Sequence, residues 1–241
     1  MILLLASLAH ADELPSMVNA VGSAIRWNAW PIPYQVNGAN DAALSPDGAV
    51  FSVVSSASAW SDVSDTAVAF KFEGSTSSSV AEHDDVNGVF FLADWPLDPE
   101  MLAVTSVWTT NDGAAVGFDM QVNTADHAWS LEGAADAADL QNALTHEFGH
   151  ALGIGHLDKS PEATMYPSAP DGETRKRDLS DDDRWVVMNF YPPAEEVLPA
   201  REALAGLSCN AVPGTAAGGF PVLLGLALTF FAARRRTLER A

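Results

Sequence analysis

Short apolar runs along the chain predict a β-sheet. Alternating or continuous apolar residues bounded by Gly, Pro, Asn and Asp are typical of strands separated by turns. Turn signals such as Asn37-Gly38 and Asn111-Asp112-Gly113 follow two of these runs. The predicted strands cover residues 27–37, 66–72, 88–93, 101–109 and 116–122.

Two other stretches have the spacing of amphipathic helices. Ser45 is suited to cap the first of them, and Pro46 is suited to its first turn. This helix is predicted to run to about Trp60. Its expected buried face consists of Val50, Val53, Val54 and Ala57.

The second helix is predicted from about residue 136 to residue 152. Its apolar stripe has a spacing of four residues and consists of Leu140, Leu144, Phe148 and Leu152. His146 and His150 are also four residues apart, so a helix places both imidazoles on one face. We expect them beside the stripe, at the boundary between the core and a cleft.

The residues from His146 to His156 read HEFGHALGIGH and indicate a metal site. Gly153 can end the helix in a left-handed conformation, which allows His156 to return as a third ligand. Three imidazoles leave the fourth position of a zinc ion open, and this is typical of a catalytic site rather than a structural one. Glu147, next to the first ligand, is the candidate general base for a water that attacks a peptide carbonyl.

The spacing H-E-x-x-H-x-x-G-x-x-H is the zinc-binding signature of the metzincins. The additional Gly and the third His make the signal much more specific than H-E-x-x-H alone. Half of the six histidines of the chain fall within these eleven residues, which argues against packing or surface roles.

Met165, followed by Tyr166 and Pro167, has the form of the Met-turn that lies under a metzincin zinc site. Pro167, together with Ser168, is expected to begin the outer wall of a substrate pocket. For Tyr166 two interpretations remain open: it lines this pocket beside the scissile bond, or it packs as a core aromatic.

Residues 27–191 resemble the catalytic domain of the matrixins, the family of the matrix metalloproteases. The resemblance includes residues 102–107 and 117–123 as two neighbouring strands, and residues 179–191 as a C-terminal helix. It implies an α+β, metzincin-like domain: a twisted five-stranded mixed sheet, a zinc-binding active-site helix, a Met-turn and a C-terminal helix. It also implies that the substrate lies antiparallel to residues 101–109.

The metal content follows the same resemblance, with one departure. His83 and His127 lack the spacing of the ligands for a second, structural zinc, so one catalytic Zn²⁺ is predicted. Structural Ca²⁺ held by loop carboxylates remains open, although no loop has the EF-hand pattern. Asp181-Asp182-Asp183 follow Ser180, where capping of a helix is favoured over calcium binding. Arg175-Lys176-Arg177 is interpreted as a solvated loop or a nicking site, and a substrate-steering role is the alternative.

Composition limits the class of partner. The formal net charge is −20, which argues against a nucleic-acid partner because such a partner requires a basic surface. The hydrophobic content of 48% is ample for a core, and residues 12–195 are predicted to form a monomeric catalytic domain that acts on a protein or peptide. The alternative is a catalytically idle adhesion module with the same fold. The intact ligands and Glu147 favour the enzyme.

The first eleven residues predict export. Residues 2–9 are apolar and end at Ala9-His10-Ala11, which has the small-x-small form of a signal-peptide cleavage site. A buried N-terminal strand is the alternative. Cys209 is the one cysteine of the chain, so an intramolecular disulfide is excluded.

The C-terminal part has a different character from the predicted domain. Residues 196–210 are interpreted as a linker, and residues 211–241 as a membrane or sorting segment. Residues 211–233 are uncharged and precede Arg234-Arg235-Arg236, as in a marginal membrane span with a basic stop. With Cys209, this segment resembles a bacterial MYXO-CTERM sorting tail. The resemblance implies cutting by a sorting protease near Cys209 and display at the cell surface, and a plain membrane anchor is the alternative.

Overall fold

The computed structural model describes residues 14–40, 42–193 and 225–233. Five strands form the central part of one sheet in the order β2-β1-β3-β5-β4. Strands β1, β2, β3 and β5 are mutually parallel, and β4 is antiparallel to β5, so the predicted five-stranded mixed sheet is confirmed. Their bounds are β1 Ile32–Val36, β2 Phe70–Ser75, β3 Gly88–Leu92, β4 Met101–Thr109 and β5 Ala115–Asn123.

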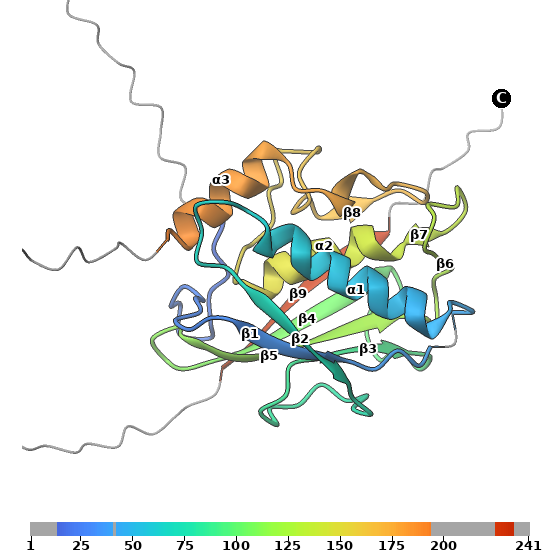
Figure 1. Cartoon of the computed structure of the whole chain (residues 1–241), viewed down its shortest axis with the longest axis horizontal. Coiled ribbons are helices and arrows are strands. Elements are labelled where there is room, and N and C mark those ends of the chain that lie inside the picture. Colours follow the sequence, from blue (N-terminus) through green and yellow to red (C-terminus); the bar gives the residue numbers. More distant parts are fainter. Residues whose placement is uncertain (1–13, 41, 194–224, 234–241) are drawn as a thin grey trace, which may run out of the picture.

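Two further strands continue this sheet beyond β4. They are β9, Gly225–Ala233, and the short β8, Ser168–Ala169, so the order extends as β4-β9-β8. Figure 1 shows β9 in red beside β4. A separate pair is formed by β6 (Trp129–Ser130) and β7 (Ala138–Asp139).

Two helices cover one face of the sheet (Figure 1): α1, Pro46–Ser61, and α2, Leu140–Ala151. Ser45 caps α1 as predicted, because its side chain accepts a hydrogen bond from the Gly48 amide at 3.1 Å. The buried face of α1 differs in part from the prediction, since Val50 and Val54 are only half-buried. The buried residues are Ala49, Ser52, Val53, Ser56, Ala57 and Trp60.

The reason for this shift is that α1 packs directly on α2 through hydrogen bonds as well as apolar contacts. Ser56 Oγ donates to the Gln141 carbonyl at 3.1 Å, and Trp60 Nε1 donates to the Thr145 carbonyl at 2.8 Å. A prediction based on apolar positions alone does not detect polar side chains that are buried because they bond to a neighbouring helix.

The active-site helix begins later than residue 136. Residues Ala138–Asp139 form β7, and Asp139 caps α2 by accepting a hydrogen bond from the Asn142 amide at 3.0 Å. The predicted apolar stripe of this helix is confirmed, because Leu140, Leu144, Phe148 and Leu152 are all buried. Phe148 meets Tyr34, Phe70 and Phe118 in edge-on contacts, with ring centroids 4.9–6.1 Å apart.

Beyond α2 the chain forms a short 3₁₀ helix, η1 (Arg175–Arg177), and the C-terminal helix α3 (Asp181–Phe190). Ser180 and Asp183 form a capping box at the start of α3, so the capping interpretation of this acidic run holds for Asp183. The solvated interpretation of the basic run is wrong for Lys176, which is 1% exposed. Its ammonium group donates to the Ser168 carbonyl in β8.

Several predicted segments lie outside the described residues: the signal peptide 1–11, the linker 196–210, and residues 211–224 and 234–241 of the C-terminal segment. Within the described residues, no helix has both the length and the apolar character needed to cross a membrane. The described part of the C-terminal segment is the strand β9.

Asp119 in β5 is buried and links the loop before β3 to the sheet. Its carboxylate accepts hydrogen bonds from the amides of Gly88, at 2.6 Å, and Glu82, at 3.0 Å. Burial raises the pKa of Asp119 to about 7, against the contribution of these two hydrogen bonds, and the nearby Asp84 and Glu82 raise it further.

This raised pKa predicts a pH-dependent contribution to stability. Between the ordinary aspartate pKa of 3.8 and the raised value of about 7, the folded chain binds the Asp119 proton more tightly than the unfolded chain does. The contribution is therefore present at low pH and is lost as the pH rises toward 7. In urea unfolding at pH 5 and pH 8, we expect wild type to lose more stability over this interval than Asp119→Asn. Equal losses would contradict the assignment.

Candidate metal centre and active site

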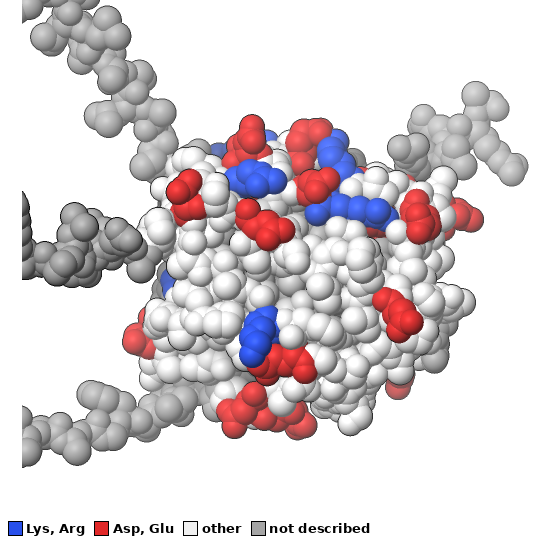
Figure 2. Space-filling view, in the orientation of Figure 1, with Lys and Arg blue, Asp and Glu red and all other residues white. Residues whose placement is uncertain are grey.

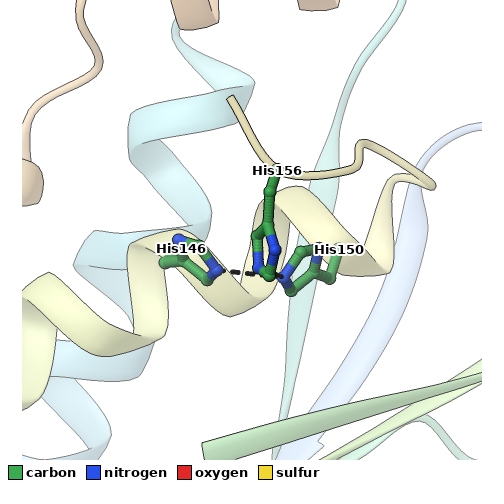
Figure 3. A group of neighbouring side chains, drawn as sticks. All are labelled: His146, His150 and His156. Atoms are coloured by element: carbon green, nitrogen blue, oxygen red, sulfur yellow. Dashed lines mark hydrogen bonds between the residues drawn. The ribbon is translucent and has the colours of Figure 1, made fainter. Parts of the chain in front are cut away.

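Three histidine side chains converge at one point of the structure (Figure 3). His146 and His150 project from the same face of α2, and His156 approaches from the loop that follows the helix. The Nε2 atoms of His146 and His150 are 2.9 Å apart, and those of His150 and His156 are 3.2 Å apart. The predicted ligands are therefore brought together.

The opposite ring nitrogens of the two helical histidines are fixed by the backbone. His146 Nδ1 lies 2.7 Å from the Thr164 carbonyl, and His150 Nδ1 lies 2.8 Å from the Ile154 carbonyl. A carbonyl only accepts, so each Nδ1 carries the proton and donates it. Each Nε2 is then left with a lone pair that points to the common centre, which is the tautomer that a metal requires.

This arrangement fits a zinc ion. Two imidazole lone pairs facing one another repel unless a cation lies between them, and tetrahedral zinc with Zn–N bonds of ~2.0–2.1 Å separates its nitrogen ligands by roughly 3.3 Å. The observed separations of 2.9 and 3.2 Å are close to this value.

The pocket also favours neutral imidazoles. Burial, followed by the neighbouring imidazoles, lowers the pKa of His146 well below its usual range, and burial lowers that of His150 to about 3.

Gly153 turns the chain so that His156 reaches the centre. Its φ is +78°, in the left-handed region predicted for this residue. A Cβ at Gly153 would lie 2.4 Å from the Ile25 carbonyl oxygen, so a side chain is also excluded by the close approach of the N-terminal segment. The turn places the Ile154 carbonyl where His150 Nδ1 can donate to it.

Met165 lies directly beneath the active-site helix. Its side chain is fully buried, and a Cβ built at Gly149 would lie 2.2 Å from the Met165 sulfur and 2.7 Å from the Trp60 ring. The glycine between the two helical histidines therefore permits the close packing of Met165 and Trp60 on α2. The Met-turn itself remains a prediction, and no sequence pattern indicated that Gly149 would face Met165.

Asp183 holds the turn that contains Met165 in place. Its buried carboxylate accepts hydrogen bonds from the amides of Thr164, at 2.7 Å, and Met165, at 3.0 Å. The same side chain accepts from the Ser180 amide at 2.9 Å in the capping box. One carboxylate thus joins the start of α3 to the residue whose carbonyl orients His146.

Glu147 lies in α2 directly after His146 and is fully buried. Thr105 of β4 donates a hydrogen bond to Glu147 Oε2 at 2.5 Å, and Oε1 has no hydrogen-bond partner among the described residues. Burial raises the pKa of Glu147 to about 8, and the hydrogen bond from Thr105 acts in the opposite direction. A cation held by the adjacent imidazoles would favour the carboxylate.

The two residues after Met165 are half-buried, and the structure leaves both interpretations of Tyr166 open. The Lys176 ammonium group lies 5.3 Å from the centre of the Tyr166 ring. Pro167 immediately precedes β8, so its place at the start of a pocket wall remains a prediction.

Other candidate ligands are not gathered into a site. Within the described ranges, His146, His150 and His156 are the one group of three or more His, Cys, Asp or Glu residues close enough to hold a metal ion. His83 instead lies 6.0 Å from the Trp108 ring, between centroids.

A three-histidine metal centre on a helix and the turn after it, above a buried methionine, defines a metzincin-type zinc protein. A family model described as Matrixin matches residues 26–192 of this chain. The chain therefore belongs to the matrixin family, and we assign the triad as its catalytic zinc site.

Curated relatives agree with this placement. The chain is 44% identical over 64 residues to metalloendoproteinase 1-MMP of Arabidopsis thaliana, covering 26% of this chain and 17% of that protein. It is 34% identical over 79 residues to human matrilysin, covering 33% and 28% respectively. It is also 34% identical over 143 residues to metalloendoproteinase 2-MMP of Arabidopsis thaliana, covering 55% and 34%. The chain thus spans at most about a third of the length of these three relatives.

The role of Asp183 predicts the effect of its substitution. Asp183→Asn replaces an acceptor oxygen by an amide group that faces backbone N–H donors, so about 1–3 kcal/mol of stability should be lost. Zinc affinity should fall about 10- to 100-fold, because Thr164 orients a ligand. The control is Asp181→Asn, an exposed carboxylate in the same turn of α3. Thermal unfolding and a competitive zinc titration measure both effects, and equal behaviour of the two variants would contradict this role.

Proposed function

We propose that this chain is a zinc-dependent metalloendopeptidase in which Glu147 is the general base. The observation that carries the proposal is the buried Glu147 carboxylate beside three imidazoles whose Nε2 atoms converge. Membership of the matrixin family and the metalloendoproteinases among its relatives support the same activity.

Each residue has a defined task in peptide hydrolysis. His146, His150 and His156 would hold the zinc ion, which, when bound, polarises the scissile carbonyl and lowers the pKa of water. Glu147 Oε1, which has no hydrogen-bond partner among the described residues, accepts the proton of the attacking water. The carboxylate then delivers this proton to the leaving amine nitrogen. Thr105 fixes the other oxygen and so orients the base. Met165 supports the helix from below, and Tyr166 and Pro167 contribute to the substrate pocket.

The charge distribution agrees with a protein or peptide substrate rather than a nucleic acid. In the face shown in Figure 2, the few basic side chains lie next to acidic ones and form no continuous basic stripe. Lys71 pairs with Glu73, and Arg175 pairs with Glu162 and Glu173.

For localisation, we propose that the chain is exported and held at a bacterial cell surface or secreted. The apolar start with its Ala9-His10-Ala11 site and the uncharged run before Arg234-Arg235-Arg236 support this proposal. The resemblance to a sorting tail further suggests processing near Cys209. Mass spectrometry of the mature protein tests both ends, and an intact chain from Met1 to Ala241 in surface fractions would refute the processing.

Substitution of the base should separate catalysis from metal binding. Glu147→Gln removes the proton acceptor and leaves the imidazoles in place, so casein hydrolysis should fall about 10²- to 10⁴-fold at unchanged zinc content. The control is Glu132→Gln, an exposed glutamate that should leave the rate unchanged. A chelator should abolish wild-type hydrolysis, and added zinc should restore it. Wild type that binds zinc and cuts nothing would instead favour the adhesion module.

Loss of the hydroxyl of Thr105 should impair turnover more than substrate binding. Thr105→Val leaves Glu147 Oε2 without its donor, so kcat should fall about tenfold or more, with KM and zinc content little changed. Thr109→Val is a matched control in the same strand, because the buried Thr109 hydroxyl has no hydrogen-bond partner among the described residues. Equal kcat values for the two variants would show that Thr105 does not position the base.

A further inference from the structure

Strand β9 occupies the sheet position next to β4, the strand whose Thr105 donates to Glu147. It pairs antiparallel with β4 from Gly225 opposite Thr109 to Ala232 opposite Met101, and parallel with β8 at Ala232 and Ala233. It also contacts α2, the helix that carries two of the zinc ligands. Residues 225–233 thus lie between β4 and β8 in the sheet.

The register places the middle of β9 opposite the residue that positions the base. Thr229, the central residue of the strand, is opposite Thr105, whose hydroxyl donates to the Glu147 carboxylate. On its other side β9 meets Ser168–Ala169, three residues after Met165. An extended peptide that passes Glu147 beside β4 would pair with the same backbone edge of β4 as β9 does.

The edge of β4 accepts one strand at a time. An edge strand offers unpaired N–H and C=O groups to any extended peptide, and these groups supply the affinity of strand addition. With β9 in place, the outer backbone groups of Met101–Thr109 are already paired. An extended substrate can therefore bind at β4 only after β9 leaves.

We propose that residues 225–233 are an intramolecular occupant of the peptide-binding edge and restrain hydrolysis until they are displaced. The inference rests on the proposed protease function. A segment of the same chain acts at an effective concentration of ~mM, so it competes well against a substrate at micromolar concentration. The 31 residues 194–224 can span up to roughly 100 Å, which allows both docking and release.

The test uses the full chain with two backbone-selective variants. Leu228→Pro with Thr229→Pro removes two successive amide donors, which face opposite sides of the strand, so β9 should no longer pair. Leu228→Ala with Thr229→Ala changes the same positions and keeps both amides. We expect kcat/KM on a fluorogenic peptide to rise about tenfold or more in the proline variant. The alanine variant should stay close to wild type, and all three chains should hold equal zinc.

Hydrogen exchange measures docking without any catalysis. In wild type and the alanine variant, amides of residues 101–109 and 225–233 should be protected, and in the proline variant residues 225–233 and the outer amides of β4 should exchange faster. If residues 225–233 of wild type exchange at the rate of a free chain, or if the proline variant has the wild-type kcat/KM, the proposal is wrong. Protection of these residues in a zinc-loaded chain that cuts no peptide would instead refute the protease function and leave β9 docked.

Discussion

Two backbone carbonyls determine the metal centre, and much of the surrounding fold serves to place them. The Thr164 and Ile154 carbonyls accept the Nδ1 protons of His146 and His150, and this alone turns both Nε2 lone pairs toward a common point. The amide of Thr164 is held in turn by Asp183, which forms the capping box of α3 with Ser180. A helix that never touches the metal therefore sets the orientation of a ligand.

The second constraint is burial, which lowers the pKa of His146 and His150 and raises the pKa of Glu147. The same dry environment keeps the imidazoles neutral and raises the pKa of the Glu147 carboxyl. Neutral imidazoles can bind a cation, and a bound cation favours the ionised carboxylate beside it. Without a metal ion, the site disfavours the ionised Glu147 carboxylate, and a bound cation would stabilise it. This complementarity explains why two histidines and a glutamate can be buried together in a stable domain.

Features of the site that depend on residues close together in the sequence were predicted, and those that depend on distant residues were not. The three ligands, Gly153 and the apolar stripe of α2 are local features of one segment, so their spacing in the sequence was sufficient. Strand β4 was predicted with its observed bounds, whereas the start of α2 was placed too early because Asp139 ends a short strand and caps the helix. Thr105, Gly149 and Asp183 act across 42, 16 and 19 residues of sequence, on Glu147, Met165 and Thr164, and no periodicity reveals such pairs.

The C-terminal apolar segment shows that a hydrophobic run does not by itself establish a position in a membrane. An uncharged run that precedes three arginines satisfies the pattern of a membrane span, because a helix meets all its own backbone hydrogen bonds in lipid. Part of the same run, Gly225–Ala233, is instead a strand here, paired along β4 on one side and with β8 at Ala232 and Ala233 on the other. For these nine residues the two placements exclude each other, since a strand paired along β4 cannot at the same time lie in a bilayer. Any process that removes residues 225–233 from the sheet therefore also exposes the backbone edge of β4 with which they pair.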